Sequence, residues 1–310
     1  MKLSVVATLY RSAPYVDEFC RRARQAARHY ANDDYEIILV NDGSPDDSLD
    51  IALQIAAADP KVTVVDLSRN FGHHKAMMTG LAHARGEEIF LIDSDLEEAP
   101  EWLNEFGRQR QASSACDVVY GVQRQRKGGW FERTTGQLFW LTLKTLTGME
   151  LPSNITTARL MSRRYVQALL LHQEREVFMA GLWFITGYRQ EACEVDKLSR
   201  ATSTYTFRKK MSLLVNSVTA FSNAPLVSIF YLGLAISLLA GCYIIFLVLR
   251  WWIEDTSMAG WTSVMASIWL LGGLLMSSLG VVGIYMAKIY TEAKARPYTI
   301  VRHVYRSDAE

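Results

Sequence analysis

The chain has 310 residues, of which 33 are basic and 32 are acidic, so its formal net charge is +1. This balance lacks the basic excess that proteins binding nucleic-acid backbones usually carry, and it excludes nucleic acid as the main partner. Half of the residues are hydrophobic, and the length suffices for one complete α/β domain and an additional segment.

The first 125 residues alternate short apolar, β-rich runs with helical patterns such as those at 15–30 and 48–58. The predicted strands cover residues 3–8, 35–40, 62–66, 89–93 and 117–120. This alternation predicts an α/β fold with a parallel, doubly wound sheet. Because ligands of such sheets bind at the carboxyl ends of the strands, the residues that follow each strand are candidates for a functional site.

The end of the second predicted strand carries the turn sequence Asn41-Asp42-Gly43-Ser44. Gly43 permits a tight turn, and Asp42 could accept hydrogen bonds from a base or a ribose; taken alone, the sequence also fits an ordinary Asp-Gly turn. The chain contains no G-x-G-x-x-G sequence, which disfavours a dinucleotide-binding dehydrogenase.

The strongest local signal follows the fourth predicted strand, where Asp93 and Asp95 are two residues apart and Glu97 comes two residues later. Several carboxylate oxygens at the end of one strand suit a hard divalent cation, and Mg²⁺ typically takes one or two carboxylates together with substrate phosphates. The alternative is a solvated acidic turn that caps the helix starting near Pro100. The position at the end of an alternating strand favours the metal site.

Residues 126–206 are less regular and contain a possible strand at 189–195. In the following segment, 207–223, apolar residues recur at helical spacing and Arg208, Lys209 and Lys210 cluster at one end. This pattern predicts an amphipathic helix in the membrane interface. The alternative is a core helix of the soluble domain.

Two long segments carry no charge, one between Lys210 and Arg250 and the other between Asp255 and Lys288. Since a bilayer span needs about 20 apolar residues, we predict two transmembrane helices near 226–249 and 262–287. They fall within residues 224–290, with a short loop at 250–261, and are followed by a tail at 291–310. Basic residues crowd the two outer flanks, whereas the loop holds one arginine and two acids, so the large domain and the tail are expected in the cytoplasm.

The motifs together resemble a known family. Val40–Ser44, then Ser68-Arg69-Asn70-Phe71-Gly72, then Asp93–Glu101 occur in the order and spacing of family 2 inverting glycosyltransferases of the GT-A fold. With two C-terminal spans, the chain resembles the polyprenyl-phosphate branch, which is similar to dolichyl-phosphate mannose synthases and bacterial bactoprenol glucosyltransferases. The resemblance implies a cytoplasmic GT-A catalytic domain at 1–206, an anchor in the bacterial inner membrane, and a homo-oligomer such as a tetramer.

The resemblance also implies roles for individual residues. The nucleotide would contact Thr8, Tyr10, Asp42, Arg69, Asn70 and Asp93. A Mg²⁺ or Mn²⁺ ion would be bound by Asp93, Asp95 and Glu97, where Glu97 stands in place of the glutamine that the family often has.

Four arginines complete the implied site. Arg124, Arg133 and Arg200 resemble basic residues that family members direct at the acceptor phosphate, and Arg159 would belong to the sugar pocket. Arg200 is assigned a catalytic role beside Asp93 and Asp95. Its segment, 200–205, lacks the glycine and lysine of the family's R-x-G-x-S-K-Y sequence.

One departure from the family carries chemical information. The family's acidic D-x-G-D-F-R-L segment reads Asn154-Ile155-Thr156-Thr157-Ala158-Arg159-Leu160 here, so both acids are absent. A sugar hydroxyl needs a base to accept its proton in the transition state. A phosphate monoester, with a second pKa near about 6, is already largely dianionic at neutral pH and needs only positioning and charge stabilisation.

We therefore predict inverting transfer of a sugar from a nucleotide diphosphate, uridine by resemblance, to undecaprenyl-type phosphate, for use in O-antigen or other cell-envelope glycans. Two alternatives stay open. The first is direct transfer to a hydroxyl of a glycan or lipid-linked saccharide. The second is a non-catalytic membrane sensor of sugar nucleotides, which the intact Asp93, Asp95 and Arg69 disfavour.

Overall fold

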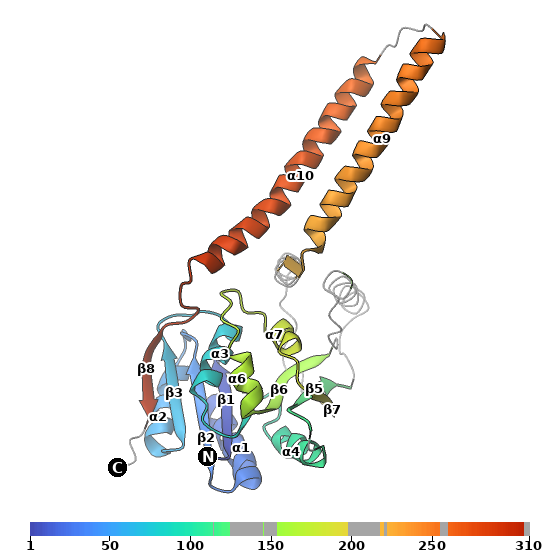
Figure 1. Ribbon diagram of the computed structural model, residues 1–310. Coiled ribbons are helices and arrows are strands. Elements are labelled where there is room, and N and C mark those ends of the chain that lie inside the picture. The colour runs from blue at the N-terminus through green and yellow to red at the C-terminus, as the bar shows by residue number, and fades with distance from the viewer. Residues whose placement is uncertain are drawn as a thin grey trace. The chain divides into compact units, whose positions relative to one another are not determined.

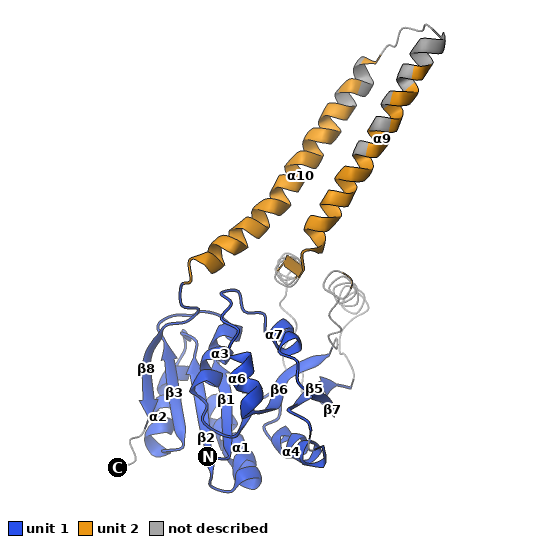
Figure 2. Cartoon of the chain, in the orientation of Figure 1, with its two compact units in different colours: residues 1–141, 149–206, 296–310 blue, residues 142–148, 207–295 orange. Residues whose placement is uncertain are grey.

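The computed structural model describes residues 1–113, 115–124, 145, 154–197, 218–219, 222–254 and 260–306 (Figure 1). Two compact units are distinguished by colour in Figure 2. The first comprises Met1–Leu141, Met149–Thr206 and Arg296–Glu310, and the second comprises Thr142–Gly148 and Phe207–Ala295. Most of the predicted interfacial helix at 207–223 lies outside the described residues, so that helix stays a prediction.

Within the described residues, the first unit is built on one eight-stranded sheet with the order β7-β5-β6-β4-β1-β2-β3-β8. The strands are β1 (Leu3–Leu9), β2 (Tyr35–Asn41), β3 (Val62–Leu67), β4 (Glu88–Asp93), β5 (Val118–Gln123), β6 (Ile155–Ser162), β7 (Gln190–Val195) and β8 (Val301–Arg306). The strand expected at 189–195 is therefore confirmed as β7.

The centre of the sheet is parallel, as the sequence predicts. β1 pairs in parallel with both β2 and β4, and β2 pairs in parallel with β3. Thr8 lies opposite Asp93 on one side, and Leu9 lies opposite Asn41 on the other. These strands are almost fully buried and rich in Val, Ile and Leu, as expected when helices cover both faces of a sheet.

Helices cover both faces of this sheet. On one face, α1 (Val16–Ala31) contacts α2 (Ser48–Ala58) and α4 (Trp102–Ala112). Phe19 of α1 and Phe106 of α4 join Val5 and Leu9 of β1 in the main hydrophobic core. On the other face, α3 (His73–His83) packs on β1 and β2, and α6 (Arg163–Leu169) packs on β4 and β6. The first unit is thus an α/β/α sandwich.

The edges of the sheet differ from the predicted all-parallel arrangement. β6 lies between β4 and β5 and runs antiparallel to both. The predicted strand at 117–120 is present as β5, but it therefore does not pair with β4. Residues 154–160 align with a site motif of the family, but they also form part of a strand buried between two neighbours. Ala158 and Leu160, and Met161 after them, are fully buried.

The chain's end corrects another expectation. Residues 291–310 were predicted to form a tail after the second span, but residues 301–306 form β8, which pairs antiparallel with β3. Val64 and Val65 of β3 lie opposite Tyr305 and Val304. Because β3 would otherwise expose its backbone groups at the edge of the sheet, the added strand satisfies them.

The second unit contains the helices α9 (Ala224–Glu254) and α10 (Trp261–Ala293), which contact each other. The stretch Ser267–Ala293 of α10 is long and apolar enough to cross a membrane. Among the described residues of α9, the apolar stretch Ala224–Ala240 is shorter than a membrane span. Large apolar side chains such as Trp269 and Met276 are exposed on α10, as lipid-facing residues would be. Two transmembrane helices therefore stay a prediction.

Candidate functional site

The acidic turn at the end of β4 is held in a constrained conformation. Leu96 adopts a positive φ of 59°, which is uncommon for a non-glycine residue, and its side chain is buried in the core. The backbone N–H of Glu97 donates to Asp95 Oδ1 at 2.9 Å. Ser94 Oγ donates to the carbonyl oxygen of Thr8 at 2.7 Å, which ties the turn to the end of β1. The two carboxylates thus project from a fixed turn.

Asp93 is surrounded by groups that stabilise its ionised form. His73 Nε2 lies 3.2 Å from Asp93 Oδ1, and the other ring nitrogen of His73 is 3.0 Å from Thr8 Oγ1. Burial opposes ionisation of Asp93, but the hydrogen bond and charge of His73, with a hydrogen bond from Thr157, outweigh it and lower the pKa of Asp93. Conversely, burial disfavours protonation of His73, but Asp93 raises the pKa of the imidazole.

A lysine balances the other acids of the turn. Lys197 Nζ lies 3.3 Å from Glu97 Oε2 and 3.5 Å from Glu98 Oε1. Burial raises the pKa of Asp95. Burial and the neighbouring Asp93 charge raise the pKa of Glu98 to about 7. The carboxylates outweigh the effect of burial on Lys197 and raise its pKa, so the ammonium form is favoured.

Glu98 also connects the turn to β6. Its Oε1 accepts a hydrogen bond from the backbone N–H of Thr157 at 3.0 Å, and its Oε2 accepts one from the N–H of Ala158 at 2.8 Å. The side chain is completely buried. Glu98 therefore holds the segment that replaces the family's acidic motif against the carboxylates of β4.

The acidic turn fits a divalent cation that shares its coordination with a substrate. Asp93 Oδ1 is buried, and apart from the His73 imidazole at 3.2 Å it has no polar partner within the described residues, so its charge is only partly compensated by the protein. No group of three or more His, Cys, Asp or Glu side chains in this part of the chain could hold a metal by itself. A cation at this turn would need further ligands such as phosphate oxygens of a substrate, and the predicted ligation by Asp93, Asp95 and Glu97 stays a prediction.

Two loops predicted to contact the nucleotide, 41–44 after β2 and 68–72 after β3, pack tightly against each other; we call them the nucleotide-side loops. Both oxygens of Asp42 accept backbone hydrogen bonds, from Phe71 N at 2.7 Å and from Gly72 N at 3.0 Å. Gly43 has a φ of +58°, and a Cβ added there would meet Asn70 N at 2.4 Å. The structure therefore gives Asp42 a role in shaping the loop between β3 and α3. Its predicted contact with a nucleoside stays a prediction.

The other predicted nucleotide residues lie at the carboxyl ends of β1 and β3. Thr8 is largely buried in β1, and Tyr10 follows that strand with an exposed side chain. Arg69 and Asn70 follow β3 and are exposed, and the Arg69 guanidinium lies 4.2 Å from the centre of the Phe71 ring. Thr8, Asp42, Asp93 and the loop after β3 are thus brought to one edge of the sheet.

The predicted arginines occupy different environments. Arg124 is exposed and donates to Glu194 Oε2 at 3.0 Å. Arg159 is fully buried on β6, with its guanidinium 3.0 Å from the centre of the Trp183 ring, and burial lowers its pKa. We interpret Arg159 as an anchor of β6, and its contact with a sugar stays a prediction. Arg133 and Arg200 lie outside the described residues.

Sequence reasoning missed His73, Glu98 and Lys197. His73 opens α3 directly after the Phe71-Gly72 pair, and Glu98 is the next acid after Glu97, so their proximity to known motifs was a usable signal. Lys197 follows β7 and reaches the acidic turn only through tertiary structure.

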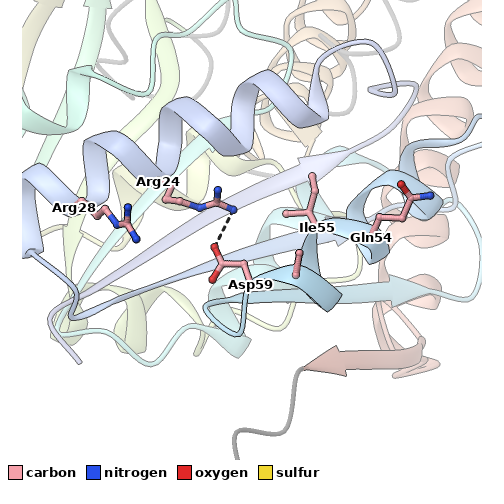
Figure 3. Close-up of a pocket in the computed structure, with 6 residues that line it drawn as sticks. Arg24, Arg28, Gln54, Ile55 and Asp59 are labelled. Atoms are coloured by element: carbon pink, nitrogen blue, oxygen red, sulfur yellow. Dashed lines mark ion pairs between the residues drawn. The ribbon is translucent and has the colours of Figure 1, made fainter.

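A surface pocket lies at the opposite edge of the sheet (Figure 3). Its lining residues come from α1 and from the end of α2. Arg24 of α1 forms an ion pair at 2.8 Å with Asp59, which follows α2. The carbonyl oxygen of Asp59 accepts a hydrogen bond from Val62 N at the start of β3. The pocket is therefore at the amino end of β3 and is separate from the candidate site.

Known proteins resemble this chain over most of its length. Residues 4–170 match the model of Glycosyl transferase family 2. A Mycobacterium tuberculosis protein named among glycosyltransferases is 49% identical over 99% of this chain and 90% of its own length. An Escherichia coli protein named as a prophage bactoprenol glucosyl transferase homolog is 30% identical over 98% of this chain and 99% of its own length.

Among solved structures, a mannosyltransferase from Pyrobaculum calidifontis in complex with GDP-Man and Mn²⁺ is 17% identical, with a TM-score of 0.45 over 95% of this chain and 86% of that one. The family model spans more than half of the chain and includes the acidic turn and both nucleotide-side loops. The chain therefore belongs to glycosyl transferase family 2, and its first unit is a GT-A-like α/β domain.

Proposed function

We propose that this glycosyltransferase moves a sugar, with inversion, from a nucleotide diphosphate, with UDP as the favoured carrier, to polyprenyl phosphate of the undecaprenyl type. The observation that carries the acceptor assignment is the replacement, at the family's acidic position, of a carboxylate by Thr157. Thr157 stands where many family members have an acid, and it helps to lower the pKa of Asp93. Glu98, the carboxylate bonded to the same segment, is fully enclosed.

An acceptor phosphate suits such a site. One of its oxygens would attack the anomeric carbon as the bond from that carbon to the nucleotide diphosphate breaks, and the nucleotide diphosphate leaves. Because the phosphate is already anionic, no proton has to be removed. A hydroxyl acceptor would need a base, but Thr157 stands at the family's acidic position, and the exposed imidazole of His73 is already paired with Asp93, which raises its pKa.

Asp93 and Asp95 would hold Mg²⁺ or Mn²⁺ together with the diphosphate, and the ion would supply charge neutralisation for the leaving group. His73 favours the ionised form of Asp93, and Lys197 balances Glu97 and Glu98. These neighbours keep the turn charged and ordered before substrate arrives, which is the form of preorganisation that stabilises a transition state.

The acceptor phosphate would be bound by Arg124, Arg133 and Arg200, since a planar guanidinium pairs well with phosphate oxygens. Arg124 forms exposed ion pairs with Glu194 and Asp196, which are weak enough to be exchanged for a ligand. Relatives named bactoprenol glucosyl transferases, such as that of Shigella phage SfII at 29% identity over 99% of this chain, support a lipid phosphate as the acceptor.

We further propose that α9 and α10 cross the bacterial inner membrane and that the catalytic unit and both termini are cytoplasmic. The apolar stretch of α10 supports one span. The basic flanks support the orientation, because cytoplasmic segments next to spans carry an excess of Lys and Arg.

Product analysis tests this function. The purified full-length chain, polyprenyl phosphate and Mn²⁺ are incubated with a panel of radiolabelled sugar nucleotides. We expect label from one of them to enter an organic-extractable product that mild acid releases. Label in a product that resists mild acid would favour a hydroxyl acceptor, and binding of nucleotide without any transfer would favour a sensor.

A further inference from the structure

The C-terminal strand β8 contributes an arginine to the edge of the sheet that carries the nucleotide-side loops. β8 follows α10 through residues 294–300 and pairs with β3, whose carboxyl end leads into Ser68-Arg69-Asn70. Thr299 reaches α3, with its hydroxyl 2.8 Å from that of Thr79. The chain that leaves the second helix therefore becomes part of the catalytic unit.

Arg302 of β8 compensates the charge of Asp66, a buried carboxylate of β3. Its Nη1 lies 3.2 Å from Asp66 Oδ2. Asp66 is 1% exposed, and within the described residues this oxygen accepts no hydrogen bond, so the ion pair with Arg302 is its compensation. A buried carboxylate without such a partner is strongly unfavourable.

Asp66 in turn orients the loop that follows β2. Asn41 Nδ2 donates to Asp66 Oδ1 at 2.8 Å, and Asn41 Oδ1 accepts from the backbone N–H of Ser44 at 3.1 Å. Asn41 is itself buried, and its amide therefore fixes the turn Asn41-Asp42-Gly43-Ser44. The same turn supplies Asp42, which holds Phe71 and Gly72.

Arg302 also holds the second loop directly. Its Nη2 donates to the carbonyl oxygen of Ser68 at 2.7 Å, and the N–H of Ser68 donates to the carbonyl oxygen of Ile300 at 2.9 Å. Ser68 immediately precedes Arg69 and Asn70. One guanidinium thus reaches, through Asp66 and through Ser68, both segments predicted to contact the nucleotide.

We propose that Arg302 is a positioning residue for nucleotide binding, which rests on the function proposed above. Arg302 orders the loops after β2 and β3 through Asp66, Asn41 and Ser68. The planar guanidinium suits this task because it directs two donors in fixed directions at once, one to a carboxylate and one to a carbonyl oxygen. A lysine would retain the charge beside Asp66 but not both bonds.

Arg306 provides a matched control on the same strand. Its Nε donates to Thr63 Oγ1 at 3.4 Å, and Thr63 lies near the start of β3, at the end remote from the loops. Replacing Arg306 removes an arginine and shortens a side chain on β8 without touching Asp66 or Ser68. A loss of binding that arises merely from weakening β8 would therefore appear in both variants.

The test measures equilibrium binding of UDP and GDP to the full-length chain in detergent with Mn²⁺, without acceptor, and uses the tighter nucleotide as the probe. We expect Arg302→Ala to weaken binding at least about tenfold, on the scale of a lost charge-assisted bond, and Arg306→Ala to leave it within about twofold. Arg302→Lys should restore part of the loss. In turnover assays, KM for the sugar nucleotide should rise similarly while kcat changes less than about threefold.

Wild-type binding by Arg302→Ala, or an equal loss in Arg306→Ala, would overturn this inference alone. If Arg302→Ala does not fold, Arg302→Gln replaces it, because glutamine keeps a donor for Ser68 but no charge for Asp66, and the same tenfold loss is expected. Failure of the wild-type chain to bind either nucleotide would overturn the proposed function and this inference together.

Discussion

The two aspartates of the acidic turn differ in the balance of forces on their charge. Asp93 is paired with His73, and its pKa is lowered despite burial, whereas burial raises the pKa of Asp95. The pairing with His73 therefore favours the ionised form of Asp93 even without a bound cation. Asp95 gains most from a cation, because its own surroundings, with Asp93 and Glu97 nearby, disfavour its charge.

Asp95→Asn should lower turnover at least about 100-fold, which is the scale of losing a main electrostatic stabiliser of a transition state. The exposed Asp50 on α2 provides the control, since Asp50→Asn makes the same isosteric change away from the site. Initial rates with and without EDTA are the measurement. Full activity of the wild-type chain in EDTA would contradict the metal assignment.

Substitution of Thr157 tests whether transfer needs a carboxylate base at the position where many family members have an acid. Thr157→Asp restores a carboxylate near Asp93, whose pKa Thr157 helps to lower. We expect transfer to polyprenyl phosphate to be no faster, and slower where like charges repel. Thr157→Asn, which adds a similar volume without charge, is the control. A clear gain in rate for the aspartate variant alone would show that this enzyme uses a base.

The sequence could predict Asp93 and Asp95 because the carboxyl ends of parallel strands meet at one edge of a sheet. It could not predict Lys197 beside Glu97 or Thr157 beside Asp93, because those contacts join segments that are distant along the chain. Arg124 shows the same limit. The sequence predicts a phosphate-binding role for this residue, but its ion pair with Glu194 depends on the pairing of β5 with β7.

At the scale of elements, the site depends on how closely two loops approach. Gly43 combines a positive φ with a contact that no Cβ could occupy, because Asn70 N would lie 2.4 Å away. Gly187 also has a positive φ, of +72°, but nothing lies within 4 Å of a Cβ added there. Comparing alanine substitutions at Gly43 and Gly187 therefore distinguishes the cost of the left-handed backbone conformation from the cost of disrupting loop packing.

Gly43→Ala should therefore destabilise the protein by about 2–4 kcal/mol, combining the cost of the left-handed conformation with that of overpacking. Gly187→Ala should cost only about 1–2 kcal/mol, from the conformation alone. Unfolding monitored in detergent gives both values, and nucleotide binding should be lost only in Gly43→Ala. Equal destabilisation in the two variants would contradict the role of close loop packing.

The parallel centre of the sheet could be predicted because its strands are continuous apolar runs separated by helices. Strands β6 and β8 could not. β8 is short, and its polar residues Arg302, His303 and Arg306 are typical of a solvent-exposed tail. The edge of β3 with which it pairs forms only when the chain folds. β6 was obscured by its resemblance to a site motif.

For the whole molecule, the distribution of charge predicts that the loop between α9 and α10 faces away from the cytoplasm. A cysteine at Ser257, in a chain where the exposed Cys242 is replaced by serine, should react in intact cells with a membrane-impermeant thiol reagent. A cysteine at Ser307 should react only after the cells are opened. Labelling of position 307 in intact cells would reverse the proposed orientation.

Whether the acceptor is a lipid phosphate or a lipid hydroxyl can be measured in one comparison. The full-length chain is given its preferred sugar nucleotide with either polyprenyl phosphate or the matching polyprenol, which has the same chain but no phosphate. Because Thr157 replaces the acid that could serve as a base and a phosphate acceptor needs none, we expect transfer to the phosphate alone. Efficient transfer to the polyprenol would contradict it.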